Sequence, residues 1–178
     1  MDERVLVKEC LKGSSIAQKE LFDKFAPKMM FVCLRYMGEQ TEAEDVLQEA
    51  FIKVFRSLPK YQFEGSFEGW IRRIVVNSCL DAIRKNKQFM NDHSLESVEY
   101  KLSTSEGAID QLYAEDLLKL IKQMPPGYQA VFNLFAIEGY SHKEIAELLG
   151  ISEETSKSQY YRARAYMKNC LEKLTFER

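Results

Sequence analysis

The sequence is poor in the residue types on which metal sites and secreted folds depend. Its 178 residues include only four cysteines and two histidines, and no two cysteines form a C-x-x-C pair. This spacing argues against a zinc site and favours buried free thiols. No apolar stretch of signal-peptide length lies near residue 1, and none approaches the roughly 20 residues that cross a bilayer. We therefore expect a folded protein of the cytoplasm that needs no metal or other cofactor.

Signatures of catalysis are also missing. The sequence contains no P-loop, no nucleophile elbow and no pair of carboxylates in a cleft pattern. His142 falls in the first turn of a predicted helix, where we interpret it as an exposed or capping-region residue rather than a catalytic one. We expect no catalytic residue and no small-molecule substrate.

The overall charge hides a strongly uneven distribution. The net charge of −2 and the sequence pI near 5.8 at first argue against a nucleic-acid partner. However, residues 53–87 hold eight bases and three acids, and residues 157–173 hold five bases and one acid. Residues 92–116 hold seven acids and one base. Two basic regions therefore flank an acidic middle.

The apolar pattern indicates an all-α protein with two small helical domains. Apolar residues recur with the 3.6-residue period of a helix, and we find no convincing strand. Residues 1–90 read as the first domain and residues 109–178 as the second. Residues 91–108 are polar and acidic, with Ser, Thr and Gly near their end, and predict a flexible linker.

Two further signals bear on the first domain. Ser15 to Met37 reads as one long helix in which Pro27 must either produce a kink or begin a second half. Thr41 and Glu44 have the S/T-x-x-E spacing of a capping box, which predicts that a helix begins there.

The second domain contains the pattern of a helix-turn-helix. Ser141 and Glu144 form a capping box, and Gly150 can take the left-handed conformation that ends a helix. Ser152 is then a suitable N-cap for a second helix after a very short turn. In such a unit the first turns of the second helix meet base edges in the DNA major groove.

Four side chains of that second helix are candidates for reading bases. Lys157 and Tyr161 are spaced at i, i+4, as are Ser158 and Arg162, so the four share one broad face. The alternative is a solvated basic helix that closes an ordinary bundle. The cap, the glycine turn and the basic second helix together favour DNA binding.

The helix over residues 41–58 has an acidic exposed side. Its buried stripe consists of Leu47, Phe51, Val54 and Leu58. The residues left outside are Asp45, Gln48, Glu49 and Ile52. Such a face suits a positively charged partner, although a merely solvated face explains it equally well.

The following segment combines an aromatic loop with a basic helix face. Tyr61, Phe63 and Phe67 surround Gly65, and unstacked bases of single strands stack on exposed aromatic side chains of this kind. Burial in the core is the ordinary alternative. Arg73 and Asn77 lie one helical turn apart, where they can contact phosphates and base edges together.

Three stretches together resemble a known family. They are AEDVLQEAFIKVFRSLPKY, FEGWIRRIVVNSCLDAIRK and MPPGYQAVFNLFAIEGYSHKEIAELLGISEETSKSQYYRARAYMK, separated by a Gly-containing loop and the acidic linker. In this order and spacing they resemble the bacterial RNA polymerase sigma factors of the extracytoplasmic-function (ECF) type, which retain the second and fourth sigma regions. The resemblance runs from about Gly13 to Leu174.

The resemblance implies a dissociable initiation factor whose partners are promoter DNA, the clamp and flap of core RNA polymerase, and an anti-sigma factor. The residues that match the polymerase-binding helix are Asp45, Gln48, Glu49 and Ile52. Those that match the minus-10 contacts are Tyr61, Gln62, Phe63, Glu64, Gly65, Ser66, Arg73 and Asn77. Those that match the minus-35 contacts are Thr155, Lys157, Ser158, Gln159, Tyr161, Arg162 and Arg164.

The match has two departures, and two other functions remain open. Ser156 stands where the family usually has an aliphatic residue, and Gln159 stands where a basic residue is common, which removes a phosphate-binding charge. A stand-alone helix-turn-helix regulator would bind duplex DNA specifically without polymerase. An enzyme is disfavoured because the catalytic signatures are absent.

Overall fold

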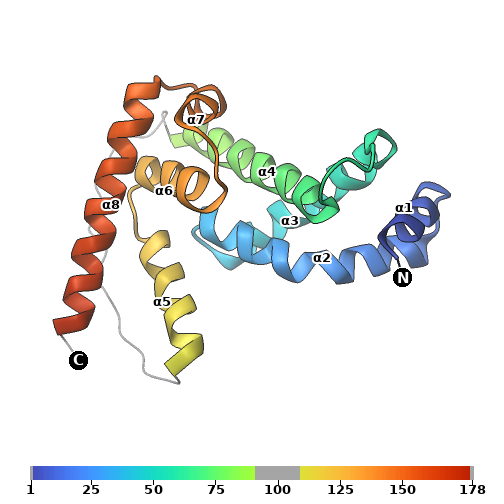
Figure 1. Cartoon of the computed structure of the whole chain (residues 1–178), viewed down its shortest axis with the longest axis horizontal. Coiled ribbons are helices and arrows are strands. Elements are labelled where there is room, and N and C mark those ends of the chain that lie inside the picture. Colours follow the sequence, from blue (N-terminus) through green and yellow to red (C-terminus); the bar gives the residue numbers. More distant parts are fainter. Residues whose placement is uncertain (1, 91–108, 177–178) are drawn as a thin grey trace. The chain divides into compact units, whose positions relative to one another are not determined.

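The computed structural model describes residues 2–90 and 109–176, and every regular element in these ranges is helical (Figure 1). By its contacts the chain divides into two compact units, Met1–Leu95 and Glu96–Arg178. An all-α protein of two helical domains was expected, and this is confirmed. The predicted linker, residues 91–108, lies outside the described residues. No helix in the described ranges is both long enough and apolar enough to span a membrane.

Unit 1 is a bundle of three long helices preceded by a short one, and Figure 1 shows how they are arranged. The helices are α1 (Glu3–Leu11), α2 (Ser15–Tyr36), α3 (Gln40–Ser57), the 3₁₀ turn η1 (Leu58–Lys60) and α4 (Phe67–Met90). Helices α2, α3 and α4 pack against one another in every pairing, and α1 packs against α2 and η1.

The core of unit 1 follows the apolar stripes of these helices. The predicted stripe of α3 is buried, since Leu47, Phe51, Val54 and Leu58 are each at most 5% exposed. Burial of each such side chain stabilises the fold by about 1.5 to 3 kcal/mol relative to leaving it in water. Because this stripe is fixed in the core, the residues on the opposite side of α3 remain exposed to solvent.

One local prediction for unit 1 was wrong. Helix α3 begins at Gln40, and its N-cap residue is Glu39, which makes no side-chain capping bond. The Glu44 carboxylate instead accepts a hydrogen bond from Gln40 Nε2 at 2.9 Å, so Thr41 and Glu44 form no capping box. The predicted long helix is present as α2, which passes through Pro27 without a break, so of the two alternatives the start of a second helix is excluded. Buried neighbours on both sides of Pro27 offset the one backbone hydrogen bond that proline removes.

Unit 2 contains α5 (Ile109–Lys122), α6 (Pro126–Phe132), the π-helical turn η2 (Asn133–Ile137), α7 (His142–Leu149) and α8 (Glu153–Phe176). Helix α8 is the long element against which α5, α6 and α7 pack (Figure 1). A small apolar core joins α5 to α8, with Tyr166 and Cys170 packed at its edge; it consists of Leu120, Ile121, Met124, Ala163 and Met167. One side of α8 is thereby fixed inward, and the opposite side is left exposed.

Candidate nucleic-acid interface

Helices α7 and α8 form the expected helix-turn-helix. The Ser141 hydroxyl accepts from the Glu144 backbone N–H at 3.3 Å, while the Glu144 carboxylate accepts from the Ser141 backbone N–H at 2.8 Å. Gly150 ends α7 with φ of 65°, in the left-handed region that disfavours side chains with a Cβ. Ser152 then caps α8 by accepting from the Thr155 backbone N–H at 3.0 Å. These local signals were read correctly from the sequence.

A polar contact that the sequence reasoning missed joins the two helices. Ser156 is fully buried, and its hydroxyl lies 2.9 Å from His142 Nδ1 in a hydrogen bond. The His142 ring stacks on Phe135, with ring centroids 4.3 Å apart and an interplanar angle of 13°. His142 lies in the capping region at the start of α7, one of the two expected placements, but it is half-buried rather than exposed. Ser156 and His142 are thus hydrogen-bond partners, and their contact helps to hold α8 against α7.

The outer side of α8 carries most of the predicted DNA-reading residues. Lys157, Ser158, Tyr161, Arg162 and Arg164 are all exposed, and Tyr161 reaches 75% exposure. The Ser158 hydroxyl donates to the Thr155 carbonyl at 2.9 Å, so its oxygen presents acceptor lone pairs outward. An exposed tyrosine among basic side chains is a suitable surface for a polyanion with apolar base edges.

Two other predicted residues lie differently. The Gln159 side-chain oxygen is buried and has no hydrogen-bond partner in the described part of the chain. It packs against Gly127, where a Cβ would lie only 3.2 Å from this oxygen. Thr155 is half-buried, and its hydroxyl lies 2.9 Å from the Ser152 hydroxyl. Gln159 is therefore turned toward α6, which explains how a residue without charge is accommodated there.

In unit 1 an aromatic cluster surrounds the loop between η1 and α4. The Tyr61 ring centroid lies 5.0 Å from that of Phe63, 4.9 Å from that of Phe67 and 5.1 Å from that of Trp70. Only Phe67 is buried, while Phe63 is 37% exposed. Phe63 also has φ of 60°, an uncommon value for a bulky residue and one that recurs at functional sites. The aromatic side chains thus divide between core and surface.

A cavity of about 130 Å³ opens beside this cluster. Tyr61, Phe63, Gly65 and Phe67 form one side of it. The other side comes from α1, through residues that the sequence reasoning did not identify: Glu3, Arg4 and Val7. The Arg4 guanidinium lies 5.8 Å from the centre of the Phe63 ring. Because α1 is distant in sequence, only the packing of α1 on η1 places a cation and a carboxylate at this cavity.

The rest of the predicted minus-10 surface is accessible. The loop residues Gln62, Glu64, Gly65 and Ser66 are exposed, and so are Arg73 and Asn77 on α4. Ile71 and Val75 on the same helix are fully buried, so α4 is anchored by one side and presents Arg73 and Asn77 on the other. Arg73 and Asn77 can therefore contact a DNA strand that also reaches the aromatic loop.

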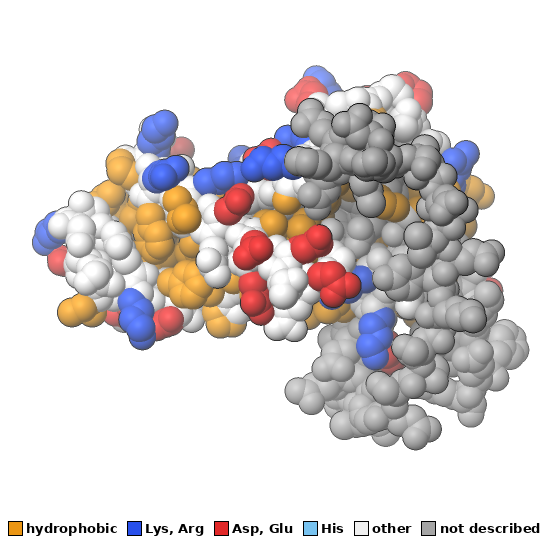
Figure 2. Space-filling view, turned by 180° about the vertical axis from the view of Figure 1, so that it is seen from behind, with side chains coloured by type: hydrophobic (Ala, Val, Ile, Leu, Met, Phe, Trp, Pro, Cys, Tyr) orange, Lys and Arg blue, Asp and Glu red, His pale blue; other side chains and the backbone are white. Residues whose placement is uncertain are grey.

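The acidic side of α3 is exposed as predicted. Asp45, Gln48, Glu49 and Ile52 all face solvent, and Ile52 is 51% exposed. Figure 2 shows acidic side chains gathered near the middle of one face, with a row of Lys and Arg side chains above them. An apolar side chain beside acids is typical of a surface that binds a basic partner with some apolar contact.

Comparison with known proteins assigns both units. The Sigma-70 region 2 family model matches residues 21–89, and the Sigma-70, region 4 model matches residues 114–167. The ECF RNA polymerase sigma factor SigW of Bacillus subtilis is 30% identical over 179 residues, covering 94% of this chain and 96% of SigW. SigE of Mycolicibacterium smegmatis is 33% identical over 163 residues, covering 89% of this chain and 63% of SigE. The chain therefore spans a little under two thirds of the longer relative.

This chain belongs to the ECF RNA polymerase sigma factors. It is a transcription initiation factor, and a stand-alone regulator is not favoured. A sigma factor RpoE from Bartonella quintana, solved with the anti-sigma factor NepR, has the same fold with a TM-score of 0.56 and 20% identity, covering 86% of this chain and 96% of that one. CnrH, solved with the cytosolic domain of CnrY, gives a TM-score of 0.53 at 21% identity, covering 96% and 97%.

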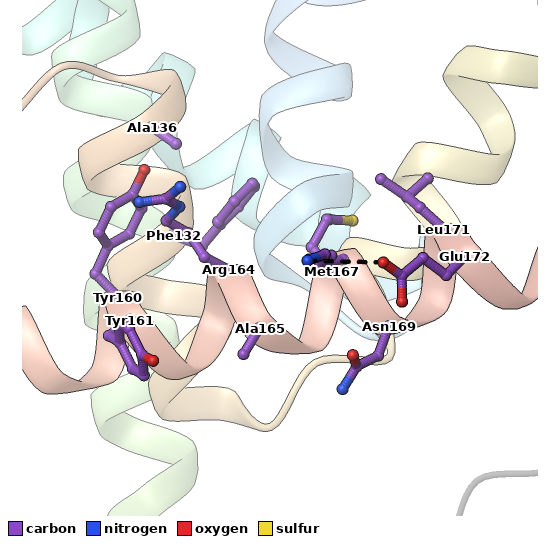
Figure 3. Close-up of a pocket in the computed structure, with 11 residues that line it drawn as sticks. Phe132, Ala136, Tyr160, Tyr161, Arg164, Ala165, Met167, Asn169, Leu171 and Glu172 are labelled. Atoms are coloured by element: carbon purple, nitrogen blue, oxygen red, sulfur yellow. Dashed lines mark ion pairs between the residues drawn. The ribbon is translucent and has the colours of Figure 1, made fainter.

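The sigma factor also has an apolar groove on unit 2, with a volume of about 1020 Å³ (Figure 3). Phe132 and Ala136 line it from α6 and η2, and Tyr160, Met167 and Leu171 line it from α8. Arg164 lies at the groove as well as on the exposed face of α8. A groove with an apolar floor and charged side chains at its edge can hold an amphipathic helix of a partner protein.

The thiols and potential metal ligands form no site in the described ranges. Cys10, Cys33 and Cys79 are buried and Cys170 is half-buried, and all four are free thiols. The Cys33 and Cys79 sulfurs lie 3.9 Å apart in the core of unit 1. No group of three or more His, Cys, Asp or Glu side chains that could hold a metal ion occurs among these residues.

Proposed function

We propose that this sigma factor opens the minus-10 element with unit 1 and reads the minus-35 element with unit 2 while bound to core RNA polymerase. The observation that carries the proposal is the aromatic cavity beside the loop Gln62 to Ser66. A stand-alone duplex reader has no use for a cavity of this kind, whereas a factor that melts DNA must hold an unstacked base.

The minus-10 step follows from the chemistry of that cavity. Extruding a base costs a few kcal/mol of unstacking, which stacking and hydrogen bonds in a pocket offset. Tyr61 and Phe63 supply the stacking surfaces, worth about 1 to 3 kcal/mol per base. Arg73 and Asn77 then contact the flanking strand, and their exposure on α4 supports this role.

The minus-35 step rests on the exposed face of α8. Lys157, Ser158, Tyr161 and Arg162 point outward from a helix whose first turn follows a tight turn, as in other helix-turn-helix proteins. We assign backbone contacts to Arg164 and Thr155. We assign Gln159 only a structural contact with α6, because its side-chain oxygen is buried.

The partner proteins follow from the two remaining surfaces. The side of α3 formed by Asp45, Gln48, Glu49 and Ile52 binds the polymerase clamp, where acids meet a basic surface. The apolar groove of unit 2 seats a helix of the polymerase flap. We also propose that an anti-sigma factor binds this chain, as the Bartonella quintana RpoE of the same fold was solved in complex with the anti-sigma factor NepR.

The proposed activity is non-enzymatic and belongs in the cytoplasm. The factor positions DNA, and the polymerase forms the phosphodiester bonds. No side chain of the factor needs to exchange a proton or hold a metal ion for this role. Polymerase and promoter DNA are in the cytoplasm, so a factor that joins them must act there.

Run-off transcription with core polymerase and genomic fragments tests the proposal. We expect new RNA 5′ ends that share two upstream elements at a fixed spacing. Asp45→Lys should abolish these starts by preventing polymerase binding, while Asp23→Lys, a matched charge reversal on α2, should leave them intact. Tight specific duplex binding by the chain alone, with no starts, would instead support a stand-alone regulator.

A further inference from the structure

The first turns of α8 contain an ion pair on the outer side of the helix. Glu153 Oε1 lies 2.8 Å from Lys157 Nζ, and the two side chains are 44% and 56% exposed. The hydrogen bond between them is the largest cause that lowers the pKa of Glu153 and raises the pKa of Lys157. Neither residue of this pair is buried, so both can meet a ligand.

The pair lies in line with residues already assigned to base reading. Glu153, Lys157 and Tyr161 follow at intervals of four residues, so their side chains form one row along α8. Glu153 is the first residue of the helix, and the N-terminal residues of a recognition helix are those that reach base edges. The Glu153 carboxylate therefore lies at the part of α8 that we assign to the DNA major groove.

Helix stabilisation alone does not account for this carboxylate. An acid in the first turn interacts favourably with the helix dipole, but the neighbouring Glu154 supplies such a charge too. An exposed i, i+4 ion pair adds little to the stability of a helix. Against this small gain, a carboxylate at a DNA-facing position is repelled by the phosphates. The Lys157 ammonium offsets part of this repulsion, and a hydrogen bond accepted from a base would offset more of it.

We propose that Glu153 and Lys157 act as a unit that reads one G·C base pair of the minus-35 element. In the major groove, guanine offers N7 and O6 as acceptors, and its cytosine partner offers the N4 amino group as a donor. Lys157 donates to the guanine acceptors while Glu153 accepts from cytosine N4. The inference rests on the proposed role of unit 2 and adds Glu153 to the reading residues as a determinant of specificity.

An A·T pair is a poorer match for the same two side chains. Adenine offers one acceptor and one donor, and thymine adds the O4 acceptor and a methyl group. Thymine O4 would face the Glu153 carboxylate, so two acceptors would meet without a proton between them. A good contact to the right base pair discriminates against the wrong one by about tenfold or more.

The test is a selection from duplexes with a randomised minus-35 element, made with the full chain alone at low salt and with its polymerase complex. For the unchanged chain we expect one position at which G·C is preferred by about tenfold. Glu153→Gln should weaken that preference at this position only, because the amide can also donate to thymine O4 while Lys157 still donates to guanine. Glu154→Gln, in the same turn, should keep the preference.

The inference is overturned if Glu153→Gln leaves every base preference unchanged. It is also overturned if this variant binds all sequences more tightly by the same factor, since Glu153 would then only repel phosphates. Run-off transcription separates this failure from a failure of the proposed function. A weakened G·C preference in Glu153→Gln, with no initiation by the unchanged chain, would refute the sigma mechanism and leave the inference standing. Initiation by the unchanged chain, with base preferences that Glu153→Gln does not alter, would refute the inference and leave the sigma mechanism standing.

Discussion

The buried contact between Ser156 and His142 should contribute measurably to the stability of unit 2. Ser156→Ala removes a hydrogen bond of 2.9 Å from a fully buried hydroxyl and leaves the half-buried His142 nitrogen without that partner. A hydrogen bond of this kind contributes about 0.5 to 1.5 kcal/mol net. We therefore expect Ser156→Ala to lower the free energy of unfolding by about 1 kcal/mol.

A double-mutant cycle isolates the contact from other effects. His142→Ala also removes the stacking on Phe135, which adds about 0.5 to 1.5 kcal/mol to its cost. The double variant should therefore be less destabilised than the two single changes together, by about 1 kcal/mol. Ser158→Ala is the matched control, because this exposed hydroxyl bonds only to the Thr155 carbonyl of its own helix.

Urea unfolding followed by far-UV circular dichroism measures these free energies. The single tryptophan, Trp70, lies in unit 1, so its fluorescence follows that unit and serves as an internal control. We expect the Ser156→Ala variant to shift the circular dichroism transition and not the fluorescence transition. If the two single changes add within about 0.3 to 0.5 kcal/mol, Ser156 and His142 are not coupled and the reasoning fails.

Four further outcomes can be checked. Gly150→Ala should destabilise unit 2 by about 1 to 2 kcal/mol in urea unfolding, because the alanine must keep a left-handed φ of 65°. A Cβ at this position would meet no neighbouring atom, so the backbone conformation alone causes the loss. An unchanged unfolding midpoint would contradict this. Arg162→Ala should cost about 1 to 3 kcal/mol at one minus-35 base pair in competition binding, whereas uniform weakening would place Arg162 on phosphate. Phe63→Ala should reduce permanganate reactivity of minus-10 thymines in the polymerase complex, and full reactivity would remove Phe63 from the melting step. Asp45→Lys should lose binding to core polymerase in gel filtration with its circular dichroism unchanged, and retained binding would exclude α3 from the interface.

The sequence by itself determined the features that depend on neighbouring residues. The Ser141 capping box and the Gly150 turn are set by contacts within one or two helical turns, and the stripe of α3 follows from the spacing of its apolar residues. Local patterns therefore predicted the helix-turn-helix and the exposed side that contains Asp45. The Thr41 capping box failed because Gln40 competes locally for the same carboxylate, and spacing alone cannot rank two such hydrogen bonds.

Only the tertiary structure decided which distant residues meet. The packing of α1 brings Arg4 to Phe63 across the aromatic loop. The crossing of α7 and α8 pairs His142 with Ser156, and the contact of α6 with α8 turns Gln159 inward. Each of these contacts depends on the angle and register of two packed helices, which no pattern within a single helix specifies. The sequence thus predicted the faces that the helices present, and the fold determined which side chains complete them.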